Sequence, residues 1–223
     1  MRRGAATALL AALPLVLTAG CGGPRALTQA EAGEALIDVA ALGEDGWTAG
    51  GIGQAAPEND GAGLDSLLSS TQGVPDPCRA ALKAFGADTG SPSAFATVTF
   101  ARAATPPAPE RALVLAVRGY DGDAPGLPDA AAAVRDCPSF EVSAGGERVS
   151  VRLRAPSYDV ADASALGLDL TSADVRQSLD LLRVRRGANL ITASVTGRDE
   201  GANHDLLARA ANAQADKVSG VAR

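Results

Sequence analysis

The sequence has one histidine, three cysteines, two lysines and few aromatic residues, which make up 3% of the chain. His204 stands before Asp205, but no Gly-x-Ser-x-Gly elbow supplies a nucleophile for such a pair. We therefore interpret His204 as a solvent-facing residue at the start of a helix. No phosphate-binding loop, dinucleotide fingerprint or zinc signature occurs either. The sequence thus predicts a protein that is not an enzyme and that uses no cofactor and no metal.

Positive charge is also scarce. The chain has 20 basic and 26 acidic residues, and two of the arginines lie within residues 1–20. Without those two, 18 basic residues stand against 26 acidic ones, which gives a net charge of −8. Such acidity argues against nucleic acid as a partner and against electrostatic adhesion to anionic lipid headgroups, because both require a positive surface.

Residues 1–20 have the features of a secretory signal: two arginines at the start, then an uncharged apolar run that ends in small residues. The run is shorter than the ~20 residues of a permanent membrane-spanning helix, so we prefer a cleaved signal to a transmembrane anchor. The segment Thr18-Ala19-Gly20-Cys21 resembles the bacterial lipobox, although Thr18 stands where the family usually has Leu. The resemblance implies that Cys21 is acylated, and several acyl chains hold a protein firmly to a membrane.

Cleavage would leave residues 21–27 as a lipidated N-terminus with a short tether, and residues 28–223 as a single domain. The expected location is the outer face of the cell membrane. Cys78 and Cys137 remain for this domain, and in an oxidising compartment we predict that they form a disulfide. The alternative, a metal pair, needs more ligands than one histidine and two distant cysteines supply. The chain-entropy model gives such a bridge about 4 kcal/mol of stabilisation.

Apolar residues recur at helical spacing in four stretches, residues 28–43, 78–85, 127–134 and 206–218. The first begins with a capping box, in which Thr28 is the N-cap and Glu31 the third helical residue, and the last has Asn203 as its expected N-cap. Cys78 lies on the second helix and Cys137 just past the third. These two helices could therefore pack on one face of a sheet and be bridged there.

Five segments have the pattern of β-strands, residues 95–100, 111–120, 148–154, 179–186 and 189–195. Arg186-Gly187-Ala188 is the expected hairpin turn between the last two. In residues 148–154 the apolar side chains alternate with Ser150 and arginines, which we expect to point outward. The predicted fold class is α+β, an antiparallel sheet of about five or six strands flanked by helices, with one disulfide.

The candidate ligand-binding residues are Arg183, Arg185 and Arg152. With Arg186 and Arg154 they could form a basic stripe on adjacent strands that binds an anionic headgroup or a carboxylate. The alternative is that these arginines lie on an outer face and pair with the many acidic residues.

Two further features have competing interpretations. Asp121, Asp123 and Asp129 could hold Ca²⁺, but their spacing does not match an EF-hand, so we prefer a turn. Trp47 could line a cleft, and we prefer a core anchor.

Several short motifs in order resemble a known family. They are a Gly-Trp after the first helix, Asp76-Pro77-Cys78-Arg79, Asp136-Cys137-Pro138-Ser139-Phe140, and a hairpin with Arg186-Gly187-Ala188-Asn189 before a closing helix. This order is similar to the extracytoplasmic sensor-type domains of actinobacteria, which occur as lipoproteins and on the outer side of a Ser/Thr kinase of the PknH type. The resemblance implies an antiparallel sheet flanked by helices, with a polar cleft that binds a ligand, but no motif transfers a cleft residue to this chain.

Together these observations predict a non-catalytic, membrane-tethered binding or sensing domain of the cell envelope, with a small molecule or an envelope component as ligand. One alternative is a structural or accessory lipoprotein that docks on another envelope protein. A further alternative is a hydrolase without a recognisable motif. A polar pocket would favour the first interpretation, an exposed apolar patch the second, and a buried acid or histidine beside a nucleophile the third.

Overall fold

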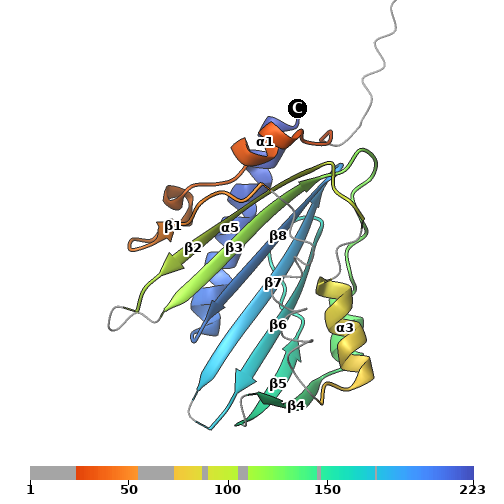
Figure 1. Cartoon of the computed structure of the whole chain (residues 1–223), viewed down its shortest axis with the longest axis vertical. Coiled ribbons are helices and arrows are strands. Elements are labelled where there is room, and N and C mark those ends of the chain that lie inside the picture. Colours follow the sequence, from red (N-terminus) through yellow and green to blue (C-terminus); the bar gives the residue numbers. More distant parts are fainter. Residues whose placement is uncertain (1–23, 55–72, 87–89, 105–109, 145–146, 174) are drawn as a thin grey trace, which may run out of the picture.

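The computed structural model describes residues 24–54, 73–86, 90–104, 110–144, 147–173 and 175–223. In these residues, eight strands form one antiparallel sheet in the order β1-β2-β3-β8-β7-β6-β5-β4 (Figure 1). The α+β class is as predicted, whereas the expected count of five or six strands is too low. The strands are β1 (Thr48–Ala49), β2 (Ala94–Arg102), β3 (Arg111–Gly119), β4 (Ser139–Ala144), β5 (Glu147–Arg154), β6 (Ala163–Thr171), β7 (Arg176–Arg186) and β8 (Asn189–Gly197). The helices are α1 (Gln29–Glu34), the 3-10 helix η1 (Val39–Leu42), α3 (Asp76–Gly86), α4 (Ala130–Asp136) and α5 (Glu200–Val221).

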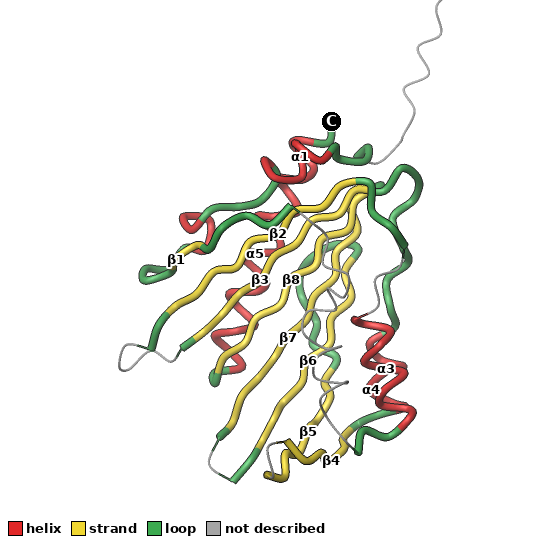
Figure 2. The backbone as a smooth tube through the Cα atoms, in the orientation of Figure 1, coloured by secondary structure: helices red, strands yellow, loops and turns green. Residues whose placement is uncertain are grey.

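The two faces of the sheet carry different helices and different cores. Leu181 and Leu182 are neighbours on β7, so their side chains point to opposite faces. Leu182 belongs to the core that contains residues of α1, η1 and α5, and Leu181 to the core that contains residues of α3 and α4. Figure 2 shows α5 behind the sheet, where it packs on β7 and β8, and α3 together with α4, which packs on β5 and β6. Trp47 is buried in the first core, as the core-anchor interpretation expected.

The sequence pattern missed β6, β4 and the two-residue β1. Ala163–Thr171 is rich in Ala, Leu, Gly and Asp, which have little intrinsic preference for strands. It is nevertheless a strand in the interior of the sheet, because β5 and β7 pair with it on both sides and Leu166 and Leu168 enter the core below α3. Tertiary pairing has overridden local propensity here.

The predicted first helix is shorter than expected. The capping box of Thr28 and Glu31 is present, but α1 ends at Glu34 and a separate 3-10 helix follows. Between the two, the side chain of Gln214 on α5 donates a hydrogen bond of 2.5 Å to the Ala35 carbonyl and accepts one of 3.1 Å from the Ile37 amide. These contacts replace intrahelical bonds, so packing against α5 interrupts the helix.

The start of α5 also differs from the prediction. Asp199 is the N-cap, and its carboxylate accepts a hydrogen bond of 3.0 Å from the Ala202 amide. Asn203, which we expected as the N-cap, lies inside the helix and is fully buried. As an N-cap, Asp accepts a hydrogen bond from a free backbone amide of the first turn as well as Asn does. Because α5 starts at Glu200, it is 22 residues long.

The disulfide prediction is confirmed. Cys78 of α3 is bonded to Cys137, the C-cap of α4, across a sequence separation of 59 residues. Both sulfurs are buried in the core that also contains Leu82, Phe85 and Phe140. The bridge thus ties the two helices together on one face of the sheet.

Residues 24–27, which follow the expected lipidation site, pack where β7 ends, β8 begins and α5 ends. The Pro24 carbonyl accepts a hydrogen bond of 3.1 Å from the Ala188 amide, and Asn189 Oδ1 accepts one of 2.9 Å from the Leu27 amide. Ala188 lies in the predicted hairpin turn, where Gly187 adopts a φ of 58°. The Arg25 amide donates to Ala222 at the end of α5. The signal and Cys21 themselves lie outside the described residues.

Within the described part of the chain, no helix combines the length and the apolar character needed to cross a bilayer.

Candidate functional site

A polar cavity of about 520 Å³ lies on the α5 face of the sheet, beyond the point where α5 begins. Its floor consists of two rows of residues that run across four strands, since cross-strand partners share a face. The first row is Ser139, Arg152, Asp169 and Ser178, and the second is Glu141, Ser150, Thr171 and Arg176. Arg198 and Glu200, which follow β8, complete the polar lining.

The next cross-strand row forms a wall of charged side chains between this cavity and α5. Arg154 of β5 donates to Asp169 at 2.9 Å and to Asp180 at 3.0 Å, and it forms an ion pair of 2.9 Å with Glu200. Gly167 of β6 lies between Arg154 and Asp180 in this row. A Cβ atom at Gly167 would lie 2.7 Å from both the Arg154 guanidinium carbon and Asp180 Oδ1. Because glycine has no side chain, Arg154 and Asp180 can contact each other across β6.

Asp180 is the most buried member of this network, with a side chain that is 1% exposed. Burial raises the pKa of its carboxyl group, although Arg154 acts in the opposite direction. Burial also raises the pKa of the nearby Tyr158 phenol, and the charge of Asp180 adds to that effect. Arg154 has a raised pKa because its three carboxylate neighbours outweigh its own burial. The network is therefore a fixed structural support for one side of the cavity.

Of the predicted ligand-binding arginines, Arg152 lines the cavity, and Arg183 and Arg185 do not. The expected stripe on adjacent strands is wrong, because β6 lies between β5 and β7. Arg183 and Arg185 have odd positions on β7 and point to the face opposite Asp180. Arg183 is buried, and Arg185 lies 3.5 Å from Asp162. Arg154 does not point outward into solvent as predicted, since Asp169 and Asp180 hold it at the sheet surface.

The sequence analysis missed most of the cavity because β4 and β6 were not recognised as strands. Asp169 and Thr171 come from β6, and Ser139 and Glu141 from β4. A sequence signal exists in retrospect: Leu166, Leu168 and Leu170 alternate with Gly167 and Asp169, which places a charge on the face opposite the apolar one.

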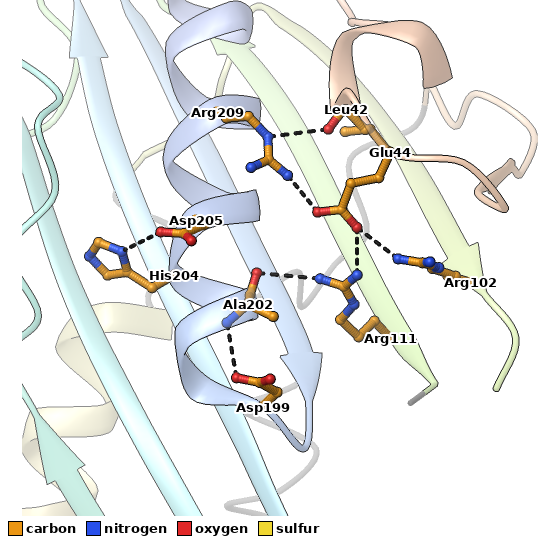
Figure 3. A network of polar contacts seen from close by, with 9 residues as sticks. All are labelled: Leu42, Glu44, Arg102, Arg111, Asp199, Ala202, His204, Asp205 and Arg209. Atoms are coloured by element: carbon orange, nitrogen blue, oxygen red, sulfur yellow. Dashed lines mark hydrogen bonds and ion pairs between the residues drawn. The ribbon is translucent and has the colours of Figure 1, made fainter. Parts of the chain in front are cut away.

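A second charged network joins the first and last parts of the chain (Figure 3). Glu44 accepts hydrogen bonds from Arg102 at 2.7 Å, from Arg111 at 2.5 Å and from Arg209 at 2.5 Å. Although burial opposes it, Arg111 and Arg209 lower the pKa of Glu44. Arg111 also stacks on the Trp47 ring, 5.5 Å from its centre. This network fixes α5 to β2 and β3 and leaves the start of α5 beside the cavity.

Two other residues considered in the sequence analysis, His204 and Asp129, have structural roles on helices. His204 lies in the first turns of α5 with a side chain that is partly exposed, and it stacks on Tyr158 (Figure 3 shows its contact with Asp205). Its Nε2 lies 3.0 Å from the Ser157 carbonyl oxygen. Asp129 is the N-cap of α4. The residues that the structure describes contain no group of three or more His, Cys, Asp or Glu side chains placed to hold a metal ion.

These features define an α+β domain with a disulfide-tied helix pair on one face of its sheet and a polar cavity on the other. The chain has the fold of the extracellular domain of PknH from Mycobacterium tuberculosis, with a TM-score of 0.55 over 89% of this chain and 100% of that one, at 10% sequence identity. An uncharacterised protein of Mycobacterium smegmatis, the Rv0999 ortholog, matches with a TM-score of 0.46 over 80% of this chain and 97% of its own, at 14% identity.

No protein-family model matches the sequence. No curated protein matches it either.

Proposed function

We propose that this protein is a membrane-anchored lipoprotein whose extracytoplasmic domain binds a ligand in the cavity over β4 to β7 and has a sensing rather than a catalytic role. The observation that carries the proposal is the cavity itself. Its volume of about 520 Å³ lies within the range of small-molecule sites, roughly 300–1,000 Å³. Its floor residues stand on paired strands, which fix the positions of their backbones.

Two features support a location outside the cytoplasm. The disulfide between Cys78 and Cys137 is a bond that persists in oxidising compartments and is rare in the cytosol. The fold is also that of a domain that is extracellular in PknH, which is the arrangement that the sequence motifs suggested. A lipid on Cys21 would then anchor the domain to the outer face of the cell membrane.

The position of the anchor relative to the cavity follows from α5. Its last turns lie beside Arg25, and its first residue, Glu200, lines the cavity. A helix of 22 residues spans about 33 Å, which therefore separates the two sites. Cys21 precedes Pro24 by three residues, so the chain can carry its Cα atom no more than about 11 Å from Pro24. With the proposed lipid on Cys21, the cavity would lie at the end of the domain that is distal to the membrane.

The described surface gives less support to the alternatives. In the described segments, three large hydrophobic side chains are exposed, Ile52, Val114 and Val175. A protein-docking face would need a larger apolar patch. For a hydrolase, His204 contacts a backbone carbonyl instead of a serine or cysteine nucleophile. Ligand binding is therefore the function that the geometry supports best.

Native mass spectrometry of the full chain, purified in detergent from its own envelope, tests the proposal. We expect a co-purified small molecule, and we expect Ser150→Trp, which fills the cavity floor, to abolish its retention. Ser143→Trp is the matched control, since Ser143 is exposed on β4 and does not line the cavity. Equal retention of the ligand by both variants would show that it binds outside this cavity and would contradict the proposed binding site.

The anchor has its own test. Cys21→Ala should move the protein from the membrane to the soluble fraction, and metabolic labelling with a fatty acid should disappear. Unchanged membrane retention of the Cys21→Ala protein would contradict the lipid anchor without affecting the cavity.

A further inference from the structure

Three arginines of the cavity differ from most others in the protein. In the described part of the chain, arginines such as Arg25, Arg102, Arg111, Arg148, Arg154, Arg185 and Arg209 have carboxylate partners within 4 Å. Arg152, Arg176 and Arg198 form no hydrogen bond or ion pair with the described residues, and all three line the same cavity. Although the chain has an excess of acidic residues, no carboxylate of the described segments pairs with these three guanidinium groups.

The acidic residues of the cavity are, by contrast, already neutralised. Asp169 and Glu200 are both paired with Arg154, each at 2.9 Å, and Glu141 lies 3.7 Å from Arg148 outside the cavity. The uncompensated charge of the lining is therefore positive, although the lining contains as many acids as arginines. Because Arg154 lies between Asp169 and Glu200, these acids cannot also turn to Arg152 and Arg198 without giving up their present partner.

The cross-strand register places the free guanidinium groups around one space. Arg152 and Arg176 stand on β5 and β7, in neighbouring rows of the cavity floor, with β6 between them. Two strand spacings and a step of two residues along the strand separate their backbones by about 12 Å. Arg198 follows Gly197, the cross-strand partner of Ser178 on β7. Long side chains from these positions can meet a ligand from two sides, and Ser139, Ser150 and Thr171 provide hydroxyl groups between them.

We infer that the ligand is a small polar molecule with two anionic groups, phosphates or carboxylates, held between Arg152 on one side and Arg176 with Arg198 on the other. This inference rests on the proposed ligand-binding function and specifies its chemistry. A guanidinium donates two parallel hydrogen bonds to a carboxylate or phosphate, and such charge-assisted bonds are about twice as strong as neutral ones. A ligand with two anionic groups would satisfy guanidinium groups that this acidic protein leaves unpaired.

A soluble anion and a lipid headgroup share this chemistry, and the architecture favours the soluble one. The cavity lies about 33 Å from the end of the domain at which Pro24 and Arg25 lie. A membrane that holds the lipid anchor is therefore on the opposite side of the molecule from Arg152.

Arg152 gives the sharpest test, because Arg176 and Arg198 also border a second cavity of about 360 Å³ and Arg152 does not. Isothermal titration calorimetry of the full chain in detergent would use pyrophosphate and citrate as probes. We expect binding by the wild type at low salt, with affinity reduced about tenfold in Arg152→Gln and restored in part by Arg152→Lys. Arg135→Gln, an exposed change of the same charge on α4, is the control and should bind as the wild type.

The outcomes separate this inference from the proposed function. If a co-purified ligand is lost in Ser150→Trp but retained in Arg152→Gln, the cavity binds a ligand and the anionic chemistry is wrong. If Arg152→Gln and Arg135→Gln weaken the probes equally, the effect is general charge and the inference fails. Binding to vesicles that contain phosphatidylglycerol, dependent on Arg152, would identify a lipid headgroup and overturn the soluble source.

Discussion

Arg154 donates a hydrogen bond of 3.0 Å to Asp180, a carboxylate that is almost completely buried on the central part of the sheet. A buried charge without a partner is costly, and removal of one member of such a pair typically destabilises a protein by 3–5 kcal/mol. Breaking the pair should therefore destabilise the sheet, and the two side chains form part of the adjacent cavity wall.

Arg154→Gln should lower the free energy of unfolding by about 3 kcal/mol at pH 8, because Asp180 would stay buried without its guanidinium partner. Burial already raises the pKa of Asp180, and the loss of Arg154 should raise it further. A carboxyl group with a raised folded-state pKa favours the folded state at low pH and loses that contribution as the pH rises through the folded pKa. The penalty in urea unfolding should therefore be smaller at pH 5 than at pH 8.

Asp180→Asn is the matched control for that experiment. It removes the buried charge and leaves Arg154 paired with Asp169 and Glu200, so it should lower the free energy of unfolding less than Arg154→Gln does. The double variant should be little less stable than Arg154→Gln alone. A cost for Arg154→Gln that is the same at both pH values would contradict the role given to Asp180.

Glu44→Gln should destabilise the fold by about 2 kcal/mol at neutral pH, because Arg111, which is buried, and its two neighbours would lose their shared carboxylate. Arg111 and Arg209 lower the pKa of Glu44 in the folded state. The contribution of Glu44 is therefore present above its unfolded pKa, about 4.3, and is lost as the pH falls through the folded value. Urea titrations between pH 7 and pH 3 should show the wild type and the variant converging on acidification. Parallel curves would refute this.

The double variant Cys78→Ser/Cys137→Ser should lose about 3–4 kcal/mol of stability, since the bond closes a long loop in the unfolded chain. Chemical unfolding with and without a thiol reductant would measure this. The reduced wild type should behave like the double variant, and the variant itself should not respond to the reductant. Wild-type stability that does not change on verified reduction would show that the two helices are held by packing alone.

Gly187→Ala should release the segment after the anchor from the end of the domain. A Cβ atom there would lie 2.1 Å from the Pro24 backbone oxygen, and the φ of 58° is unfavourable for alanine. We expect a loss of about 1–3 kcal/mol and faster proteolysis near residues 24–27. Gly126→Ala, where no atom lies within 4 Å of the added carbon, should leave the cleavage rate unchanged. Equal rates in both variants would mean that the segment is not held by this turn.

Local signals identified much of the secondary structure. The capping box at Thr28, the alternation of Val149, Val151 and Leu153, and the Gly187 turn depend on residues close together in sequence, and all three are present in the structure. The pairing of Cys78 with Cys137 was also predictable, because the proposed export left two cysteines for one bond. The first three features depend on neighbouring residues, and the disulfide depends only on the number of cysteines that remain.

The cavity, in contrast, depended on tertiary structure. Ser139, Arg152, Asp169 and Ser178 are far apart in the chain and become neighbours only when β4 to β7 pair in their particular register. β6 has weak strand propensity, so the residues that it contributes had no local signal strong enough to define them. Composition and short motifs predicted the class of the protein and its expected location. Strand pairing decided that Arg154 lies against carboxylates and that Arg152 lines the cavity.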